Sequence, residues 1–108
     1  MRTVLLLVTS DPRKSPRPAE ALRVAAGLNA WRNVKPLLYF GGAAAAALAP
    51  GDFVDEEIYR QHLDGLAAIP GTVYVEAESQ SASLSNVQAL TRLELANLAT
   101  KSDCVLYF

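Results

Sequence analysis

The stretch Thr3-Val-Leu-Leu-Leu-Val-Thr9 is an uninterrupted apolar run. A strand with one solvent-exposed face alternates apolar and polar residues, whereas a strand covered on both faces is apolar throughout. The run therefore predicts a central strand of a parallel sheet. A turn-rich, basic loop follows from Ser10 to Arg17, and Pro18 suits the first position of a helix.

Strand and helix patterns alternate along the rest of the chain. Extended apolar segments predict further strands at residues 34–40, 72–77 and 104–108. Helical patterns occupy residues 18–31, 43–48 and 55–69, and another follows the capping-box pattern Ser85-Asn-Val-Gln88. Pro36 cannot donate a ladder hydrogen bond, so its strand lies at a sheet edge or pairs only beyond that residue.

This alternation predicts an α/β fold with a mostly parallel sheet and helices on both faces. We expect a flavodoxin-like, three-layer sandwich of about four strands in the order 2-1-3-4, since right-handed crossovers leave few topologies. A length of 108 residues suits one domain that spans residues 1–108.

Composition narrows the classes of function. A net charge of −1 argues against a nucleic-acid binder, which usually carries a basic surplus. No apolar run approaches the ~20 residues that cross a bilayer, so we expect a cytoplasmic protein that binds no membrane. The single cysteine, Cys104, excludes an internal disulfide framework and a multi-cysteine metal site.

The carboxyl ends of the strands form the candidate ligand site, because ligands of open α/β sheets bind there, near the switch in strand order. The predicted rim comprises Ser10, Asp11, Gly41, Gly42, Glu76, Glu78 and Ser79. Glu76 and Glu78 point to the same side if the strand extends that far, and such a pair could bind a metal or act in acid/base chemistry. The alternative is one solvated carboxylate and one paired with a basic residue, and on that interpretation we predict no metal site and no catalytic residue.

A second candidate site precedes the first helix. Its residues are Arg13, Lys14, Ser15 and Arg17. A helix amino terminus attracts anions, so a phosphate, a sulfate or an acidic partner is one interpretation. The loop lacks the glycines with which a backbone wraps a phosphate, which favours a solvated loop and no cofactor. Cys104 follows Asp103 at a strand start, and because free cysteines are commonly buried we predict a structural thiol there.

Three segments resemble one known family. They are the strand end Val8-Thr-Ser-Asp-Pro12, the alanine-rich helix Ala19–Ala25 and the closing segment Ser102–Phe108. Over nearly its whole length the chain resembles the DsrE/DsrF/TusD-like sulfur-relay family. The resemblance implies a small α/β domain, assembly into dimers, trimers or hexamers, and, in active members, sulfur carried on a cysteine at the end of the third strand. The matching position here is Glu76, and a carboxylate cannot carry a persulfide.

The resemblance therefore implies a non-catalytic subunit or small-ligand-binding member of a sulfur-relay-type oligomer, with a cysteine-bearing paralogue as a candidate partner. Sulfur transfer or enzyme activity through Cys104 or the Glu76/Glu78 pair is an alternative, as is a nucleotide-binding flavodoxin-like module. An apolar edge strand at residues 104–108 must be covered or paired, which independently predicts a homo-oligomer.

Overall fold

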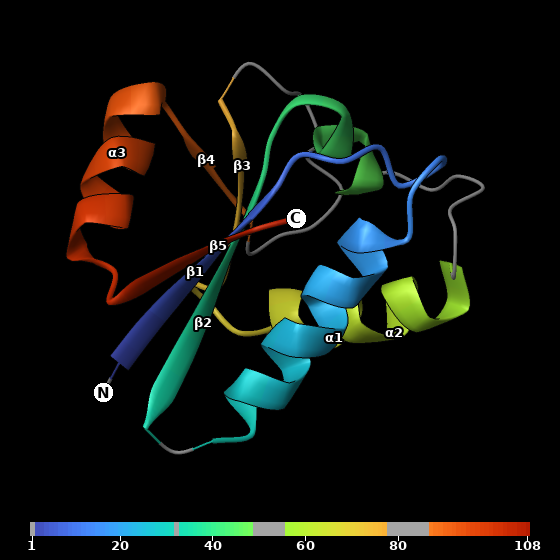
Figure 1. The fold of residues 1–108 in the computed structure, drawn as a ribbon, viewed down its shortest axis with the longest axis horizontal. Helices are drawn as coiled ribbons and strands as arrows, with labels where there is room; N and C mark the ends of the chain where they lie inside the picture. Colours follow the sequence, from blue (N-terminus) through green and yellow to red (C-terminus); the bar gives the residue numbers. More distant parts are fainter. Residues whose placement is uncertain (1, 32, 49–55, 78–86) are drawn as a thin grey trace.

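The computed structural model describes residues 2–31, 33–48, 56–77 and 87–108, and a parallel sheet runs through its centre (Figure 1). The strands are β1 (Arg2–Val8), β2 (Val34–Phe40), β3 (Val73–Glu76), β4 (Gln88–Leu90) and β5 (Cys104–Tyr107). The helices are α1 (Arg17–Asn29), the 3-10 helix η1 (Gly42–Leu48), α2 (Glu56–Ala67) and α3 (Arg92–Lys101). The strand order is β4-β3-β2-β1-β5, and each neighbouring pair is parallel. The predicted α/β class is thus confirmed.

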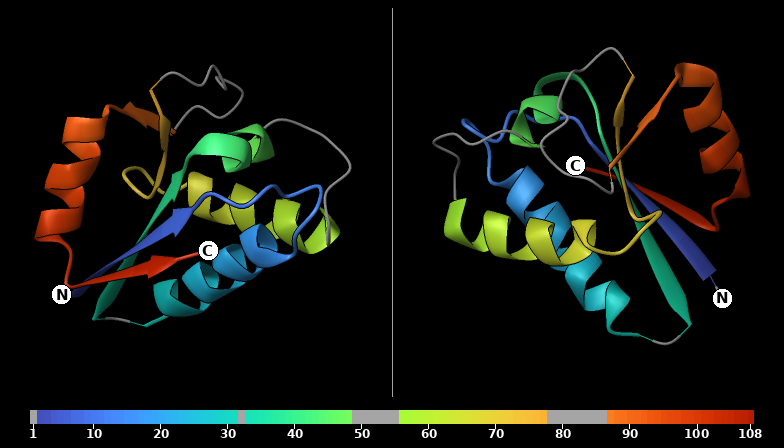
Figure 2. Two further views of the ribbon diagram at one scale, coloured as in Figure 1. Left: turned by 45° about the horizontal axis from the view of Figure 1, so that its top comes forward. Right: turned by 180° about the vertical axis from the view of Figure 1, so that it is seen from behind.

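Helices cover the two faces of the sheet unequally (Figure 2). On one face, α1, η1 and α2 share a core cluster with Leu6, Val8 and Phe40. On the other face, α3 packs alone against Leu5, Leu37 and Tyr39. The α3 helix has no fully buried residue, so this second layer is the thinner one. The apolar run around β1 explains the arrangement, since its alternate side chains enter both clusters.

The strand order corrects the predicted order of 2-1-3-4. The structure places β2 between β1 and β3, and β5 rather than β3 completes the other side of β1. Right-handed crossovers put successive helices on one face while the chain moves in one direction across the sheet. The predicted order would need α2 on the face opposite α1, yet Leu63 of α2 lies in the same cluster as Leu22 of α1. The chain therefore moves onward from β1 through β2 to β3.

The pairing of β2 explains how a proline is tolerated in a central strand. Backbone N–H groups of a strand alternate between its two sides, so the nitrogen of Pro36 faces the same side as that of Leu38. Leu38 N donates to the carbonyl oxygen of Thr72 over 2.8 Å, and the register with β3 begins at this residue. The prediction of pairing only beyond Pro36 is correct on the β3 side, and the edge alternative is wrong.

The segment before α3 differs most from its prediction. Residues 88–90 form the added edge strand β4 instead of the start of a helix, and Ala77 N donates to the Leu90 carbonyl oxygen over 2.9 Å. The helix begins later, where Thr91 and Glu94 form a capping box. Both this pattern and the predicted one satisfy the same spacing rule. The strand pairing with β3 selects the later start. None of the helices in the described ranges is long and apolar enough to cross a membrane.

Candidate functional site

The carboxyl edge of the sheet is joined by hydrogen bonds that run from strand to strand. The carbonyl oxygen of Phe108, just after β5, accepts from Thr9 N over 3.0 Å and from Ser10 N over 3.4 Å. The carbonyl oxygen of Val8 accepts from Gly41 N over 3.0 Å. Beyond β2, Gly42 N donates to Oε2 of Glu76 over 3.0 Å. The structure thus brings Ser10, Gly41, Gly42 and Glu76 to one edge.

Both glycines at the end of β2 are required by local geometry. A Cβ at Gly41 would lie 2.9 Å from Cε1 of the buried Tyr39 ring, closer than such atoms normally approach. Gly42 has a φ of +56°, a left-handed conformation that costs other residues about 1–2 kcal/mol. This conformation lets the chain turn into η1 while its N–H group meets Glu76.

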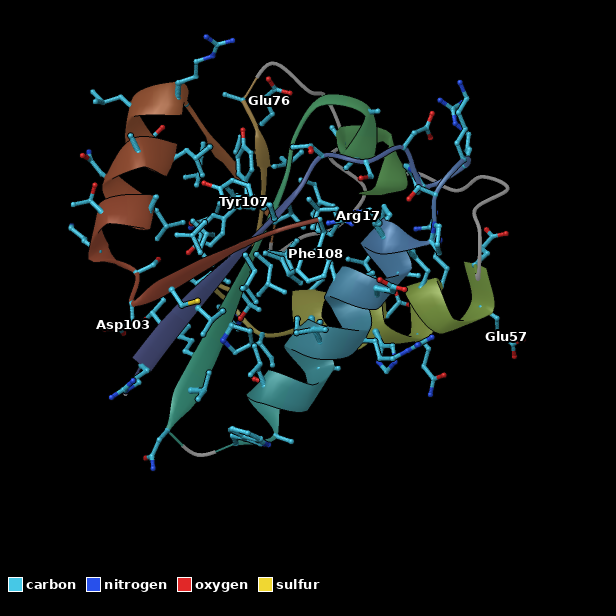
Figure 3. The ribbon with its side chains drawn as sticks, viewed as in Figure 1. Arg17, Glu57, Glu76, Asp103, Tyr107 and Phe108 are labelled. Atoms are coloured by element: carbon cyan, nitrogen blue, oxygen red, sulfur yellow. The ribbon has the colours of Figure 1, made fainter. Side chains whose placement is uncertain are left out.

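Glu76 is the last residue of β3 and is half-buried. Its hydrogen bond holds the carboxylate over the end of β2, and Figure 3 shows it at the end of its strand. Glu78 and Ser79 lie outside the described residues. The described strand β3 ends at Glu76, so the structure does not test whether the two glutamates point to the same side. The carboxylate pair therefore stays a prediction.

The loop before α1 is folded upon itself. Oδ1 of Asp11 accepts from the backbone N of Arg13 over 2.9 Å and forms a 3.3 Å ion pair with Arg13 Nε. The backbone hydrogen bond chiefly lowers the pKa of Asp11, and the Arg13 and Lys14 charges lower it further. Ser15 Oγ accepts from Arg17 N and so closes the turn into the helix. Of the predicted anion-binding cations, Arg13 is thus already paired with a carboxylate.

Arg17 is occupied at the other end of this loop. Its Nη2 donates to the carbonyl oxygen of Tyr107 over 2.9 Å, and its guanidinium carbon lies 5.9 Å from the centroid of the Phe108 ring. Figure 3 shows these residues together beside α1. The position between β1 and β5 is where the strand order reverses, the usual ligand crevice of such sheets. The backbone of residues 107 and 108 bonds across it to Thr9, Ser10 and Arg17, a role that the sequence reveals only once β5 is known to pair with β1.

Cys104 corrects the prediction of a buried thiol, because it is exposed. It opens β5 opposite Val4, at the amino edge of the sheet and away from the rim. The next residue, Val105, packs toward α3, so Cys104 points to the other face. There α1 packs over β1 and β2, and the edge strand is left less covered. The charged neighbour in sequence is Asp103, whose Oδ2 accepts from Thr3 N over 2.7 Å.

Comparisons with known proteins add one finding. No protein-family model matches the sequence, and neither does any curated protein. Among solved structures, the crystal structure of the ychN protein from E. coli is similar, with a TM-score of 0.79 and 23% sequence identity. The match covers 100% of this chain and 100% of that one. At this identity the likeness establishes the fold, which the chain shares with the ychN protein from end to end.

Proposed function

We propose that the chain is a non-catalytic, DsrE-like subunit that binds a small ligand at its carboxyl edge and carries no sulfur there. The observation that carries the proposal is the 3.0 Å hydrogen bond from Gly42 N to the Glu76 carboxylate. It holds an acid at the position where the resemblance implies a sulfur-carrying thiol. The fold shared with the ychN protein, together with the sequence resemblance, supports this assignment.

The chemistry of the rim favours a ligand with hydrogen-bond donors. One oxygen of Glu76 accepts from Gly42, and the other oxygen of the carboxylate can also accept a hydrogen bond. Arg13 is paired with Asp11, and Arg17 is bound to the Tyr107 carbonyl oxygen. Two of the cations of the loop before α1 are therefore engaged within the protein. An amine or amide group on the ligand matches such an acceptor-rich edge better than a phosphate does.

The exposed side of β5 supports assembly. Within the described residues, β5 pairs with β1 alone, and its Tyr107 side chain is 71% exposed. An edge strand presents unpaired backbone groups that another chain can satisfy. We propose that a second copy, or a cysteine-bearing paralogue, covers this edge. Light scattering on the purified chain tests the first option, and a species at the monomer mass of 11.6 kDa would contradict self-assembly.

A sulfur-loading experiment tests the function itself. The chain, Cys104→Ser and the double variant Glu76→Cys/Cys104→Ser are each incubated with a persulfide donor, and the intact mass is measured. Cys104→Ser should take up no sulfur. The double variant should gain one sulfur atom, because it restores a thiol at the rim position.

Two results would count against the proposal. Sulfur uptake by the native chain that Cys104→Ser abolishes would favour the alternative, transfer through Cys104, whose exposed thiol makes it accessible. A double variant that stays unloaded, although its circular dichroism matches that of the native chain, would show that position 76 is not equivalent to the sulfur-carrying site.

A further inference from the structure

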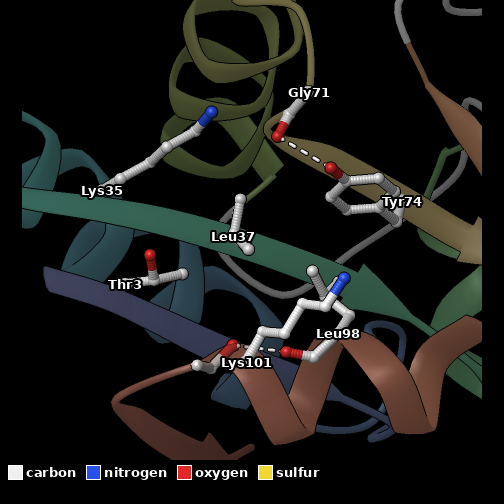
Figure 4. A pocket seen from close by; sticks show the side chains of 8 residues that line it. Thr3, Lys35, Leu37, Gly71, Tyr74, Leu98 and Lys101 are labelled. Carbon is white, nitrogen blue, oxygen red and sulfur yellow. Dashed lines mark hydrogen bonds between the residues drawn. The ribbon is translucent and has the colours of Figure 1, made fainter. Parts of the chain in front are cut away.

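A groove lies on the opposite edge of the sheet from the rim, between α3 and the amino ends of β1, β2 and β3. This groove is a cavity of about 250 Å³ (Figure 4). A second cavity of about 300 Å³ adjoins it and continues along α3 and β4 past Leu90 and the Glu94 carboxylate, and the two share Tyr74, Leu98 and Lys101. Cavities of this size fall at the lower end of small-molecule sites, which suits a ligand of about one ring. The groove shares no residue with the rim, so it is independent of the function proposed above.

The thin second layer of the fold explains why the groove exists. The helix α3 contributes half-buried side chains to its cluster and no fully buried one. The strand β4 beneath it is only three residues long. The carboxyl-terminal end of α3, near Lys101 and Ser102, therefore does not pack closely on the sheet. The surface between this end of the helix and the sheet stays open.

Two lysines bring positive charge to this groove from opposite walls. Lys35 comes from β2, and its Nζ lies 3.8 Å from the position that a Cβ would take on Gly71. Lys101 comes from the last turn of α3, and Figure 4 shows its side chain reaching into the groove toward Tyr74. Neither ammonium group forms an ion pair with a residue that the structure describes. An anion placed between them would be attracted by both charges.

The floor of the groove is apolar and one ring on its wall is fixed. Leu37 and Leu98 supply the apolar surface. Tyr74 is half-buried, and its hydroxyl donates to the Gly71 carbonyl oxygen over 3.0 Å, which holds the ring beside the lysines. An aromatic ring can pack against Tyr74 in an offset-stacked or edge-to-face arrangement. A bare inorganic anion would use the charges and leave this surface unfilled.

We propose that the groove binds a small organic anion, an aromatic ring that bears a carboxylate or phosphate group. The ring packs on Leu37, Leu98 and Tyr74, and the anionic group lies between Lys35 and Lys101. Phosphate should bind more tightly than carboxylate, because its second charge gives each lysine a stronger partner. Binding should also weaken as salt is added, since both ammonium groups are close to solvent.

Titrations of the ¹⁵N-labelled full chain followed by NMR test this proposal. The probes are benzoate, phenyl phosphate and, as the uncharged match, benzyl alcohol. Benzoate and phenyl phosphate should move the amide resonances of Gly71, Tyr74 and Leu98–Lys101 in a saturable way, and benzyl alcohol should bind much more weakly. Equal affinity for the alcohol, or shifts confined to the rim around Gly42, would overturn the proposal.

Charge-neutralising variants supply the second readout. Lys35→Gln and Lys101→Gln should each weaken phenyl phosphate binding by about two- to fivefold, as expected for a partly solvated ion pair. Arg23→Gln, on the exposed side of α1, is the matched control and should bind as the native chain does. Dispersed spectra show that each variant is folded. A Lys35→Gln/Lys101→Gln double variant that binds both anions with native affinity would refute the assigned site.

Discussion

Removing the Glu76 carboxylate tests the geometry on which the rim depends. Glu76→Ala deletes the acceptor of the Gly42 N–H group, and Glu76→Gln keeps an oxygen in the same place without the charge. A hydrogen bond to a charged group contributes about 1.5–3 kcal/mol when it is well shielded from solvent. Glu76 is only half-buried and Gly42 is exposed, so we expect a loss of about 1 kcal/mol for alanine and about half of that for glutamine.

Urea unfolding measures this loss directly. A domain of this size has an m-value of roughly 1.5 kcal/mol per molar urea, so the alanine variant should unfold about 0.7 M earlier, with an unchanged m-value. The Gly42 amide should also exchange faster with solvent, which separates this bond from a general loosening. An alanine variant with the native midpoint and native Gly42 exchange would show that the bond does not hold Glu76 in solution.

Two further predictions concern the start of α3 and the start of β5. The Thr91 backbone N–H donates to Glu94 and lowers the pKa of that carboxyl below its ordinary value of 4.5, so its stabilising effect is present above that pH and lost as the pH falls through the lowered value. Glu94→Gln should therefore unfold at lower urea than the native chain at neutral pH, and the gap should close in acid. A gap that persists unchanged in acid would mean that the charge contributes nothing. Cys104 should react fully with a thiol reagent in the native protein, and a thiol that reacts only after unfolding would contradict its exposure at the start of β5.

The strands could be predicted from the sequence wherever the residues allow only one arrangement. The apolar run of β1 requires cover on both faces, and the predicted strand at residues 34–40 matches β2. The strand order was not predictable, because it depends on which face α2 covers. The stripe of Tyr59 and Leu63 shows that α2 has a buried side, and it does not show which layer buries it. The contact with the alanine-rich face of α1 decides this, and that contact is non-local.

Part of the candidate site could be predicted from the sequence. Parallel strands bring their carboxyl ends to one edge, so the meeting of Ser10, Gly41 and Glu76 followed from the pattern. The fate of Arg17 did not follow, since its partner Tyr107 is ninety positions away in the chain. The exposure of Cys104 was missed for a similar reason. A cysteine at the start of an edge strand is buried only if a helix packs over it. No local sequence pattern shows which strands α1 covers.

The hydrogen bonds that join β1 and β5 at their carboxyl ends determine where on this edge a ligand can bind. A ligand in the usual crevice would displace Phe108 from Thr9 and Ser10, and Tyr107 from Arg17. Those three hydrogen bonds contribute about 1 kcal/mol each, so entry there would cost roughly a hundredfold in affinity unless the ligand replaced them. No such displacement is needed at Gly42 and Glu76, two strands along the sheet. The ligand that we propose for the carboxyl edge should therefore bind beside the Glu76 carboxylate, the residue at the expected thiol position.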